Sequence, residues 1–129
     1  MSEKFNLEII SPEKILLKDE IVSATIPSFE GEMTILSNHI PLITFLRPGI
    51  IKVFGNKSSE YFVEEGTVEF SKNNLIILST SIIDLKQLSK DRLSKMIADS
   101  KEKLRQDKLD DKASYIASHK IDILSSINL

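Results

Sequence analysis

The chain has 129 residues, a formal net charge of −2 and no cysteine, which suits one average domain or two small ones. Hydrophobic residues make up 41% and charged residues 28% of the sequence, and this balance excludes wholesale disorder. Without cysteine there is no disulfide framework, no thiolate zinc site and no thiol nucleophile, and the composition suits a reducing compartment.

From Phe5 to about Ser81, apolar residues recur with a period close to two in short runs, as expected for half-buried strands. The runs are separated by turn-forming residues: Ser11-Pro12, Pro27-Ser28, Pro48-Gly49, Gly55-Asn56 and Lys72-Asn73-Asn74. Many short strands joined by tight turns predict a sandwich or a barrel. The continuous apolar run from Leu75 to Leu78 predicts a central strand covered on both faces.

After about Leu85 the apolar period shifts toward 3.6, which predicts two helices. The stripe of the first helix, which Ser89 could cap, consists of Leu93, Met96, Ile97 and Leu104. A polar break at residues 106–111 offers Asp110 or Asp111 as the cap of the second helix. The second stripe consists of Ala113, Ile116, Ala117, Lys120, Ile121, Leu124 and Ile127. We therefore expect a sandwich unit over residues 1–85 and a helical hairpin over residues 86–129, which must pack on another surface.

Charge is divided unevenly between these two units. Residues 1–85 carry 7 basic and 12 acidic side chains, whereas residues 86–129 carry 10 basic and 7 acidic ones. A basic hairpin on an acidic body could be steered toward an acidic partner. Interspersed charges of both signs are equally typical of an ordinary solvated helix face.

No group of residues argues for a reaction. The stretch from Gly49 to Ser58 has the residue order of a phosphate-binding loop but not its spacing, and a strand entering a turn explains it better. His39 and His119 lie in different predicted units, so neither a metal site nor a catalytic pair is indicated. The acidic sandwich lacks the basic stripe of a nucleic-acid-binding surface. We expect no enzyme activity, no metal and no nucleic-acid partner.

One run of residues is not explained by packing alone: Phe29-Glu30-Gly31-Glu32-Met33-Thr34-Ile35-Leu36-Ser37-Asn38-His39-Ile40-Pro41-Leu42-Ile43, followed by Leu46-Arg47-Pro48-Gly49. Together with Phe5 to Glu13 before it and Val63 to Phe70 after it, this run resembles the epsilon subunit family of the rotary ATP synthase. The resemblance is dense to about Leu85 and looser beyond. The departures from the family pattern are Thr34, Ser37, Glu65 and Thr67.

The resemblance implies a ten-stranded β-sandwich followed by an antiparallel two-helix hairpin. It implies a non-catalytic subunit in the central stalk of a proton-translocating rotary ATP synthase, which couples the gamma subunit to the membrane ring of c subunits. The location it implies is peripheral, at the cytoplasmic face of a bacterial plasma (inner) membrane. No segment approaches about 20 uninterrupted apolar residues and no export signal opens the chain, so we expect neither insertion into the membrane nor export.

The same resemblance assigns interface residues. Those that would face the ring are Glu30, Gly31 and Glu32, and those near the junction of gamma and ring are His39, Pro41 and Leu42. A glycine permits a tight turn that projects the flanking carboxylates. The residues by themselves favour plainer interpretations, namely a solvated turn and a hydrogen-bonded loop histidine.

For the hairpin, the resemblance leaves two functions open. In the family, an extended hairpin reaches the catalytic alpha and beta subunits and inhibits ATP hydrolysis through basic side chains. The corresponding candidates here are Lys101, Lys103, Arg105, Lys108 and Lys112. The alternative is that these residues are solubilising charges on a permanently folded hairpin.

Some relatives bind ATP on the hairpin through an aspartate, an alanine and several arginines. Here Arg92 matches, but Ser89 and Leu93 replace the aspartate and the alanine. Residues that stand where further arginines are expected are Lys112, His119 and Ile123. Because only arginine offers a rigid bidentate donor to phosphate, we expect no cofactor and weak or absent ATP binding.

A competing hypothesis from another class is a free-standing β-sandwich module that binds a small ligand and dimerises through its hairpin. Ligand clefts are usually lined by aromatic side chains. This chain has no tryptophan and only 6% aromatic residues, which disfavours that hypothesis.

Overall fold

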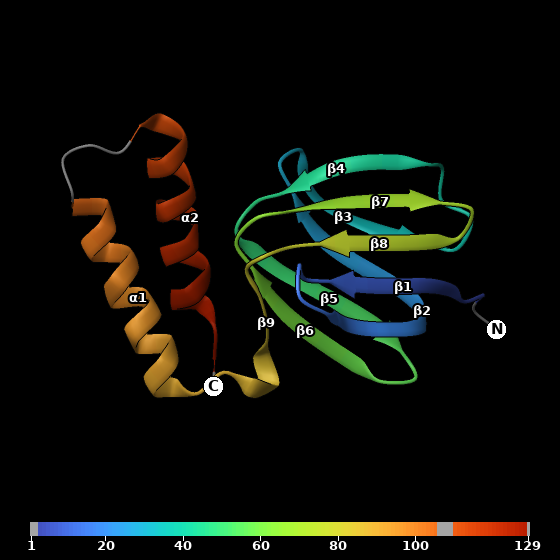
Figure 1. The fold of residues 1–129 in the computed structure, drawn as a ribbon, viewed down its shortest axis with the longest axis horizontal. Helices are drawn as coiled ribbons and strands as arrows, with labels where there is room; N and C mark the ends of the chain where they lie inside the picture. The colour runs from blue at the N-terminus through green and yellow to red at the C-terminus, as the bar shows by residue number, and fades with distance from the viewer. Residues whose placement is uncertain (1–2, 106–109, 129) are drawn as a thin grey trace.

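The computed structural model describes residues 3–105 and 110–128, in which two layers of strands are followed by two helices (Figure 1). The strands are β1 (Phe5–Ile10), β2 (Ile15–Ser28), β3 (Gly31–Leu36), β4 (Leu42–Leu46), β5 (Gly49–Gly55), β6 (Ser58–Val63), β7 (Gly66–Ser71), β8 (Asn74–Leu78) and β9 (Ile82–Asp84). A 3₁₀ turn (Leu85–Gln87) leads into α1 (Lys90–Arg105) and α2 (Asp111–Ser126). The predicted β-sandwich with a C-terminal helical hairpin is confirmed.

The described residues form nine strands, one fewer than the ten that the resemblance implies. Strand β2 is a single strand of 14 residues that serves both layers. Its first half pairs with β1, from Ile15 to Ile21, and its second half pairs with β3 and β5. The register between β2 and β5 shifts between Ile21 and Ser23. Such irregularities bend a strand, which allows β2 to pass from one layer to the other.

The first layer contains β1, β8, β7 and β4, and the second contains β3, β2, β5, β6 and β9. Strands β1 and β8 run parallel, while the other neighbouring pairs run antiparallel. Alternate residues point between the layers, and the fully buried ones include Leu7, Ile9, Ile51, Leu75 and Ile77. Burial of each such side chain contributes about 1.5–3 kcal/mol, so this interior is the main source of stability.

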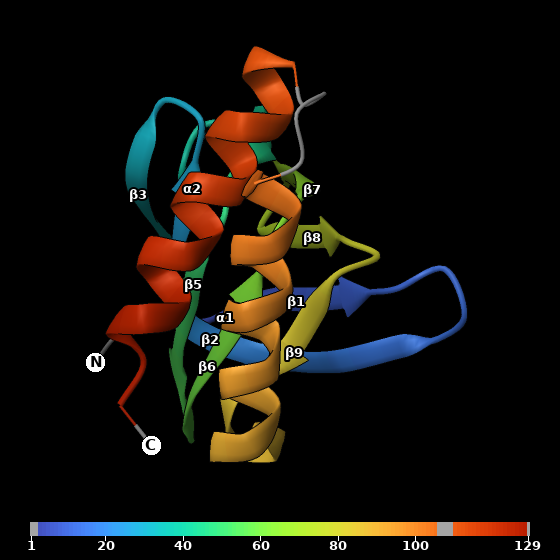
Figure 2. The same cartoon turned by 90° about the vertical axis from the view of Figure 1, so that its left-hand side faces the viewer.

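The hairpin packs against the outer side of the second layer (Figure 2). Along β6, Tyr61 and Val63 belong to the sandwich interior, whereas Phe62 points the other way, into a second apolar cluster. That cluster also contains Leu88, Leu93 and Leu124, with Ile50, Ile83, Met96, Ile97 and Ile127 packed against it. The amphipathic stripes predicted from the sequence therefore find their cover on the chain's own sandwich.

Both predicted helix caps are confirmed. The backbone N–H of Arg92 donates to Ser89 Oγ at 3.1 Å, and the N–H of Ala113 donates to Asp110 Oδ1 at 2.7 Å. The stretch resembling a phosphate loop is β5 and its turn into β6, with both strands paired to each other. Within residues 3–105 and 110–128, no helix is long and apolar enough to cross a membrane.

Two expectations about burial are wrong. Strand β8 is central, between β1 and β7, but Leu78 is 47% exposed, so the strand is not covered on both faces. Leu104, assigned to the buried stripe of α1, is 37% exposed because it lies far from the apolar cluster under the hairpin. The uncovered side of β8 belongs to a wider surface, described below.

Candidate interaction surfaces

The turn between β2 and β3 projects two carboxylates into solvent. Ser28 Oγ donates to the Gly31 carbonyl oxygen at 2.7 Å and accepts from the Glu30 N–H at 3.2 Å, which fixes the turn. Gly31 has φ +123°, a conformation that side-chain-bearing residues rarely adopt, and open space surrounds it. Glu30 and Glu32 are both exposed. The geometry suits presentation of charge to another molecule.

The β3–β4 loop, residues 37–41, is held by amide side chains. The Asn38 N–H donates to Asn73 Oδ1 at 2.7 Å, and Asn73 Nδ2 donates to Asn38 Oδ1 at 3.0 Å. Asn38 Nδ2 also donates to Glu3 Oε2 at 2.9 Å. These bonds join the loop to the β7–β8 turn and to the start of the chain, so its shape is set before any partner arrives.

Within this loop the predicted residues have different roles. The His39 ring lies edge-on to Phe70 at 5.9 Å and its Nδ1 is 2.7 Å from the Ile40 carbonyl oxygen, so it anchors the loop. Leu42 packs against the sandwich interior, while Pro41 is exposed. Ile40, which sequence reasoning did not single out, is 74% exposed. The surface that the loop offers is therefore Ile40 and Pro41.

The turn and the loop lie at opposite ends of β3. A six-residue strand spans about 20 Å, so the carboxylates of Glu30 and Glu32 do not share one site with His39 and Pro41. The two groups assigned from the sequence are thus separate surfaces.

The outer side of the first layer carries an apolar surface, which we call the outer face. It is defined by Ile10, Ile43, Phe45 and Leu78. On β4, Leu42, Thr44 and Leu46 point inward, so Ile43 and Phe45 point outward and are 75% and 60% exposed. The register places Phe45 opposite Thr67, Thr67 opposite Leu78, and Leu78 opposite Ile10. The outer-face side chains therefore lie on one side of a four-stranded layer, with Thr67 of β7 between Phe45 and Leu78. Exposed apolar side chains gathered on one side of a sheet are typical of interaction sites.

A groove of about 820 Å³ continues the outer face toward the hairpin. Its apolar lining includes Ile10, Phe29, Phe45 and Leu78, and its charged lining includes Glu65 and Lys112. Phe29 also stacks on Tyr115 of α2, with ring centroids 6.0 Å apart. The groove is therefore built by the sandwich and the hairpin together.

The basic residues assigned to the hairpin do not form one surface. Lys101 and Arg105 are exposed on α1, and Arg105 Nη1 is 3.4 Å from Glu102 Oε2. Lys103 lines a crevice between hairpin and sandwich, and Lys112 lines the groove. Lys108 lies outside the described residues. In this docked arrangement Lys101, Lys103, Arg105 and Lys112 are all exposed, but Lys103 and Lys112 border two different hollows.

The hairpin positions compared with ATP-binding relatives have structural roles here. Ser89 caps α1, and Leu93 is buried in the apolar cluster. His119 contacts Tyr115, with ring centroids 4.2 Å apart. Among the described residues, no group of three or more histidine or acidic side chains is placed to hold a metal ion.

Comparison with known proteins identifies relatives of this architecture. The family model for the beta-sandwich domain of the ATP synthase delta/epsilon chain matches residues 4–84. The ATP synthase epsilon chain of Pelagibacter ubique (strain HTCC1062) is 42% identical, over 99% of this chain and 100% of that one. The epsilon chain of Rhizobium rhizogenes is 34% identical, over 81% of this chain and 78% of that one.

Solved structures with the same fold come from two mitochondrial assemblies. A chain in the Euglena gracilis ATP synthase, in a structure of OSCP, F1 and c-ring, matches 95% of this chain and 78% of its own length, with a TM-score of 0.75 and 20% identity. A chain in the central stalk and c-ring of the Tetrahymena thermophila ATP synthase matches 96% of both chains, with a TM-score of 0.70 and 18% identity.

Proposed function

This chain belongs to the epsilon family of ATP synthase subunits, and from that premise we propose that it couples the gamma subunit to the membrane ring of c subunits. In this role it is a non-catalytic part of the central stalk of a proton-translocating enzyme. It is peripheral, at the cytoplasmic face of a bacterial plasma membrane, and held there by its protein partners. The hypothesis of a free-standing ligand-binding module is set aside.

The observation that supports a gamma contact is the unequal cover of the two sides of the sandwich. The hairpin covers the outer side of the second layer and buries Phe62 almost completely. Among residues 3–105 and 110–128, nothing covers the outer face of the first layer in this way, and Ile43 and Phe45 are mostly exposed. Transfer of apolar area from water contributes about 25 cal/mol per Å². A partner that covers the outer face therefore gains affinity from it.

The observation that supports a ring contact is the β2–β3 turn. Its Ser28 and Gly31 bonds hold Glu30 and Glu32 on a fixed backbone. Charges at the rim of an interface set orientation and association rate more than they add affinity. We propose that these two carboxylates meet polar loops of the ring.

Co-purification with gamma tests the proposal. Phe45→Glu places a charge in the outer face, and we expect it to abolish recovery of gamma from a co-expression. Phe54→Glu is the matched control, because Phe54 is also exposed, at 48%, but lies on β5 in the other layer. Loss of gamma from the Phe45 variant alone supports the assignment, and retention of gamma by that variant refutes it.

A further inference from the structure

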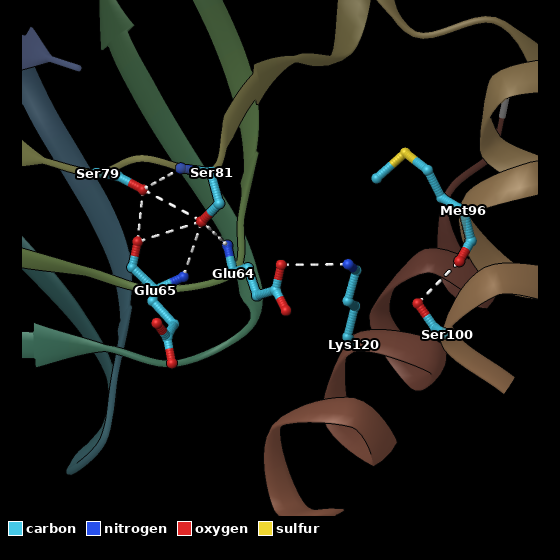
Figure 3. Close-up of polar contacts among 7 residues, drawn as sticks. All are labelled: Glu64, Glu65, Ser79, Ser81, Met96, Ser100 and Lys120. Atoms are coloured by element: carbon cyan, nitrogen blue, oxygen red, sulfur yellow. Dashed lines mark hydrogen bonds and ion pairs between the residues drawn. The ribbon is translucent and has the colours of Figure 1, made fainter. Parts of the chain in front are cut away.

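Besides the Phe29–Tyr115 stack described above, the hairpin is attached to the sandwich by two unlike contacts. Near the start of α1 and the end of α2, the attachment is the apolar cluster of Phe62, Leu88, Leu93 and Leu124. About one turn before Leu124 on α2, Lys120 Nζ lies 3.1 Å from Glu64 Oε2 (Figure 3). This is the one ion pair between sandwich and hairpin within residues 3–105 and 110–128. Both side chains are mostly buried, with 22% and 28% of their surfaces exposed.

The acidic partner is held in place by two serines (Figure 3). Ser81 Oγ accepts from the N–H groups of Glu64 at 3.3 Å and Glu65 at 3.1 Å. Ser79 Oγ donates to the Glu65 carbonyl oxygen and accepts from the Ser81 N–H at 3.0 Å. The turn that carries Glu64 is therefore preorganised, which lowers the entropy cost of forming the ion pair.

Around the ion pair, the contact between hairpin and sandwich is thinly packed. Lys120 and Glu64 line a crevice of about 270 Å³, whose hairpin side includes Ser100, Ala113 and Ala117. Ser100 Oγ donates to the Met96 carbonyl oxygen at 2.8 Å, within its own helix, so it does not bind the sandwich. Ser100, Ala113 and Ala117 bury little apolar area. The ion pair therefore adds to Ile116 and to the Phe29–Tyr115 stack in holding this half of the hairpin.

The crevice adjoins the groove at the end of the outer face. Glu65 and Thr80 line both hollows, and Lys112, two turns before Lys120 on α2, lines the groove. Movement of α2 away from Glu64 therefore carries Lys112 away from the lining of the groove.

We propose that the Glu64–Lys120 ion pair is a latch that keeps the half of the hairpin remote from the apolar cluster against the sandwich, and so completes the groove for a partner protein. The role of the groove in binding a partner rests on the proposed function, in which gamma occupies the outer face and the groove. The latch itself does not depend on it. Two sites that share one two-state element are coupled reciprocally, so partner binding in turn favours the latched hairpin.

Hydrogen exchange and spin-label distances measure the latch in the intact chain. Lys120→Met keeps the length of the side chain but removes its charge, and it leaves Glu64 unpaired in a partly desolvated site. We expect amide exchange at residues 111–119 to become about tenfold faster, while exchange in the sandwich strands stays the same. Because the chain contains no cysteine, cysteines introduced at Lys57 and Ser118 report one distance, and a second, longer distance should appear in the Lys120 variant.

Two matched variants complete the test. Glu102→Gln removes the exposed ion pair within α1 and should change neither measurement. Glu64→Lys combined with Lys120→Glu restores an opposite-charge pair and should return exchange toward the original rate, as a double-mutant cycle requires. Unchanged exchange and distances in Lys120→Met overturn the latch. If Lys120→Met also speeds exchange in the sandwich strands, the Glu64→Gln variant provides the test, since it leaves the sequence of α2 unaltered. Unchanged exchange at residues 111–119 in that variant would refute the latch.

The affinity for gamma separately tests whether the latched hairpin completes the groove for that partner. We expect Lys120→Met to weaken binding of purified gamma about fivefold, because Lys112 is then no longer held at the groove. Faster amide exchange with unchanged affinity for gamma would show that the ion pair holds the hairpin but does not contribute to the gamma-binding groove. No binding of gamma by the unaltered chain refutes the proposed function instead, and the exchange experiment still decides the latch.

Discussion

Asn38 and Asn73 exchange hydrogen bonds across 35 residues of sequence, at 2.7 and 3.0 Å, and both adopt a left-handed backbone with φ of 65° and 59°. Asparagine tolerates this conformation better than other residues that bear a side chain. The pair fixes the loop that exposes Ile40 and Pro41. Stability measurements on Asn73 can therefore separate the backbone contribution from the side-chain contribution.

We expect Asn73→Gly to lower the free energy of unfolding by about 1–2 kcal/mol, through loss of the two amide bonds. Asn73→Ala should cost about 1 kcal/mol more, because alanine is strained at positive φ. Urea denaturation of both variants measures the two terms, with Asn128→Ala as a surface control. Equal stabilities of the Gly and Ala variants would contradict the backbone argument.

Gly66 and Gly31 should respond differently to alanine. A Cβ at position 66 would lie 2.5 Å from the Leu78 carbonyl oxygen, whereas a Cβ at position 31 would meet nothing within 4 Å. We expect Gly66→Ala to cost about 2–4 kcal/mol, because β7 and β8 must move apart. Gly31→Ala should cost about 1–2 kcal/mol from backbone strain alone. Thermal unfolding orders the two, and a reversed order would refute the steric assignment.

The carboxylates of the β2–β3 turn should affect association and not folding. We expect Glu30→Gln with Glu32→Gln to leave the unfolding free energy within about 0.5 kcal/mol of the parent, since both side chains are exposed. Association of the gamma-bound chain with purified c-ring should slow, and the difference should shrink as salt is raised. Measurement of association rates at two ionic strengths checks this, and Glu13→Gln with Glu60→Gln serves as the charge-matched control.

ATP binding by the hairpin should be weak or absent. His119 is engaged with Tyr115, and Leu93 is buried in the apolar cluster. Neither supplies the bidentate donors that phosphate recognition favours. Isothermal titration of the full chain with ATP should give no saturable heat at micromolar concentrations. A micromolar dissociation constant would contradict this prediction.

Inhibition of ATP hydrolysis by the hairpin remains a prediction with two opposed outcomes. An extended, inhibitory hairpin requires Leu93 and Leu124 to leave the apolar cluster that holds it on the sandwich. If the hairpin inhibits, assembled enzyme whose subunit lacks residues 88–129 should hydrolyse ATP faster than the intact complex. Unchanged hydrolysis would assign the basic residues to solubility, and Lys101→Ala with Arg105→Ala tests the exposed pair without truncation.

Much of the architecture was predictable because each unit has a strong hydrophobic period. Alternation identified the sandwich, and a stripe preceded by Ser89 or Asp110 identified each helix and its cap. The continuity of β2 was not predictable, since Pro27 lies within the strand and yet pairs with Glu32 in the register. The count of ten strands came from the family resemblance and not from the residue pattern, and the described residues form nine.

The interaction surfaces were less predictable for a physical reason. Leu42 and Leu46 alternate with Ile43 and Phe45 on β4, so both sides are apolar and the sequence does not say which side a partner would cover. The run from Leu75 to Leu78 was taken as buried on both faces for the same reason. Lys120 did carry a signal, because a lysine inside an apolar stripe must either extend its ammonium group to solvent or pair it with a carboxylate. Here it pairs with Glu64.

The uninterrupted course of β2 has a mechanical consequence. The strand bonds to the layer that bears the outer face and also to the layer on which the hairpin rests. Sliding of one sheet over the other would have to stretch covalent backbone, which is far stiffer than side-chain packing. A pull applied to one side of the molecule is thereby delivered to the opposite side with little shear.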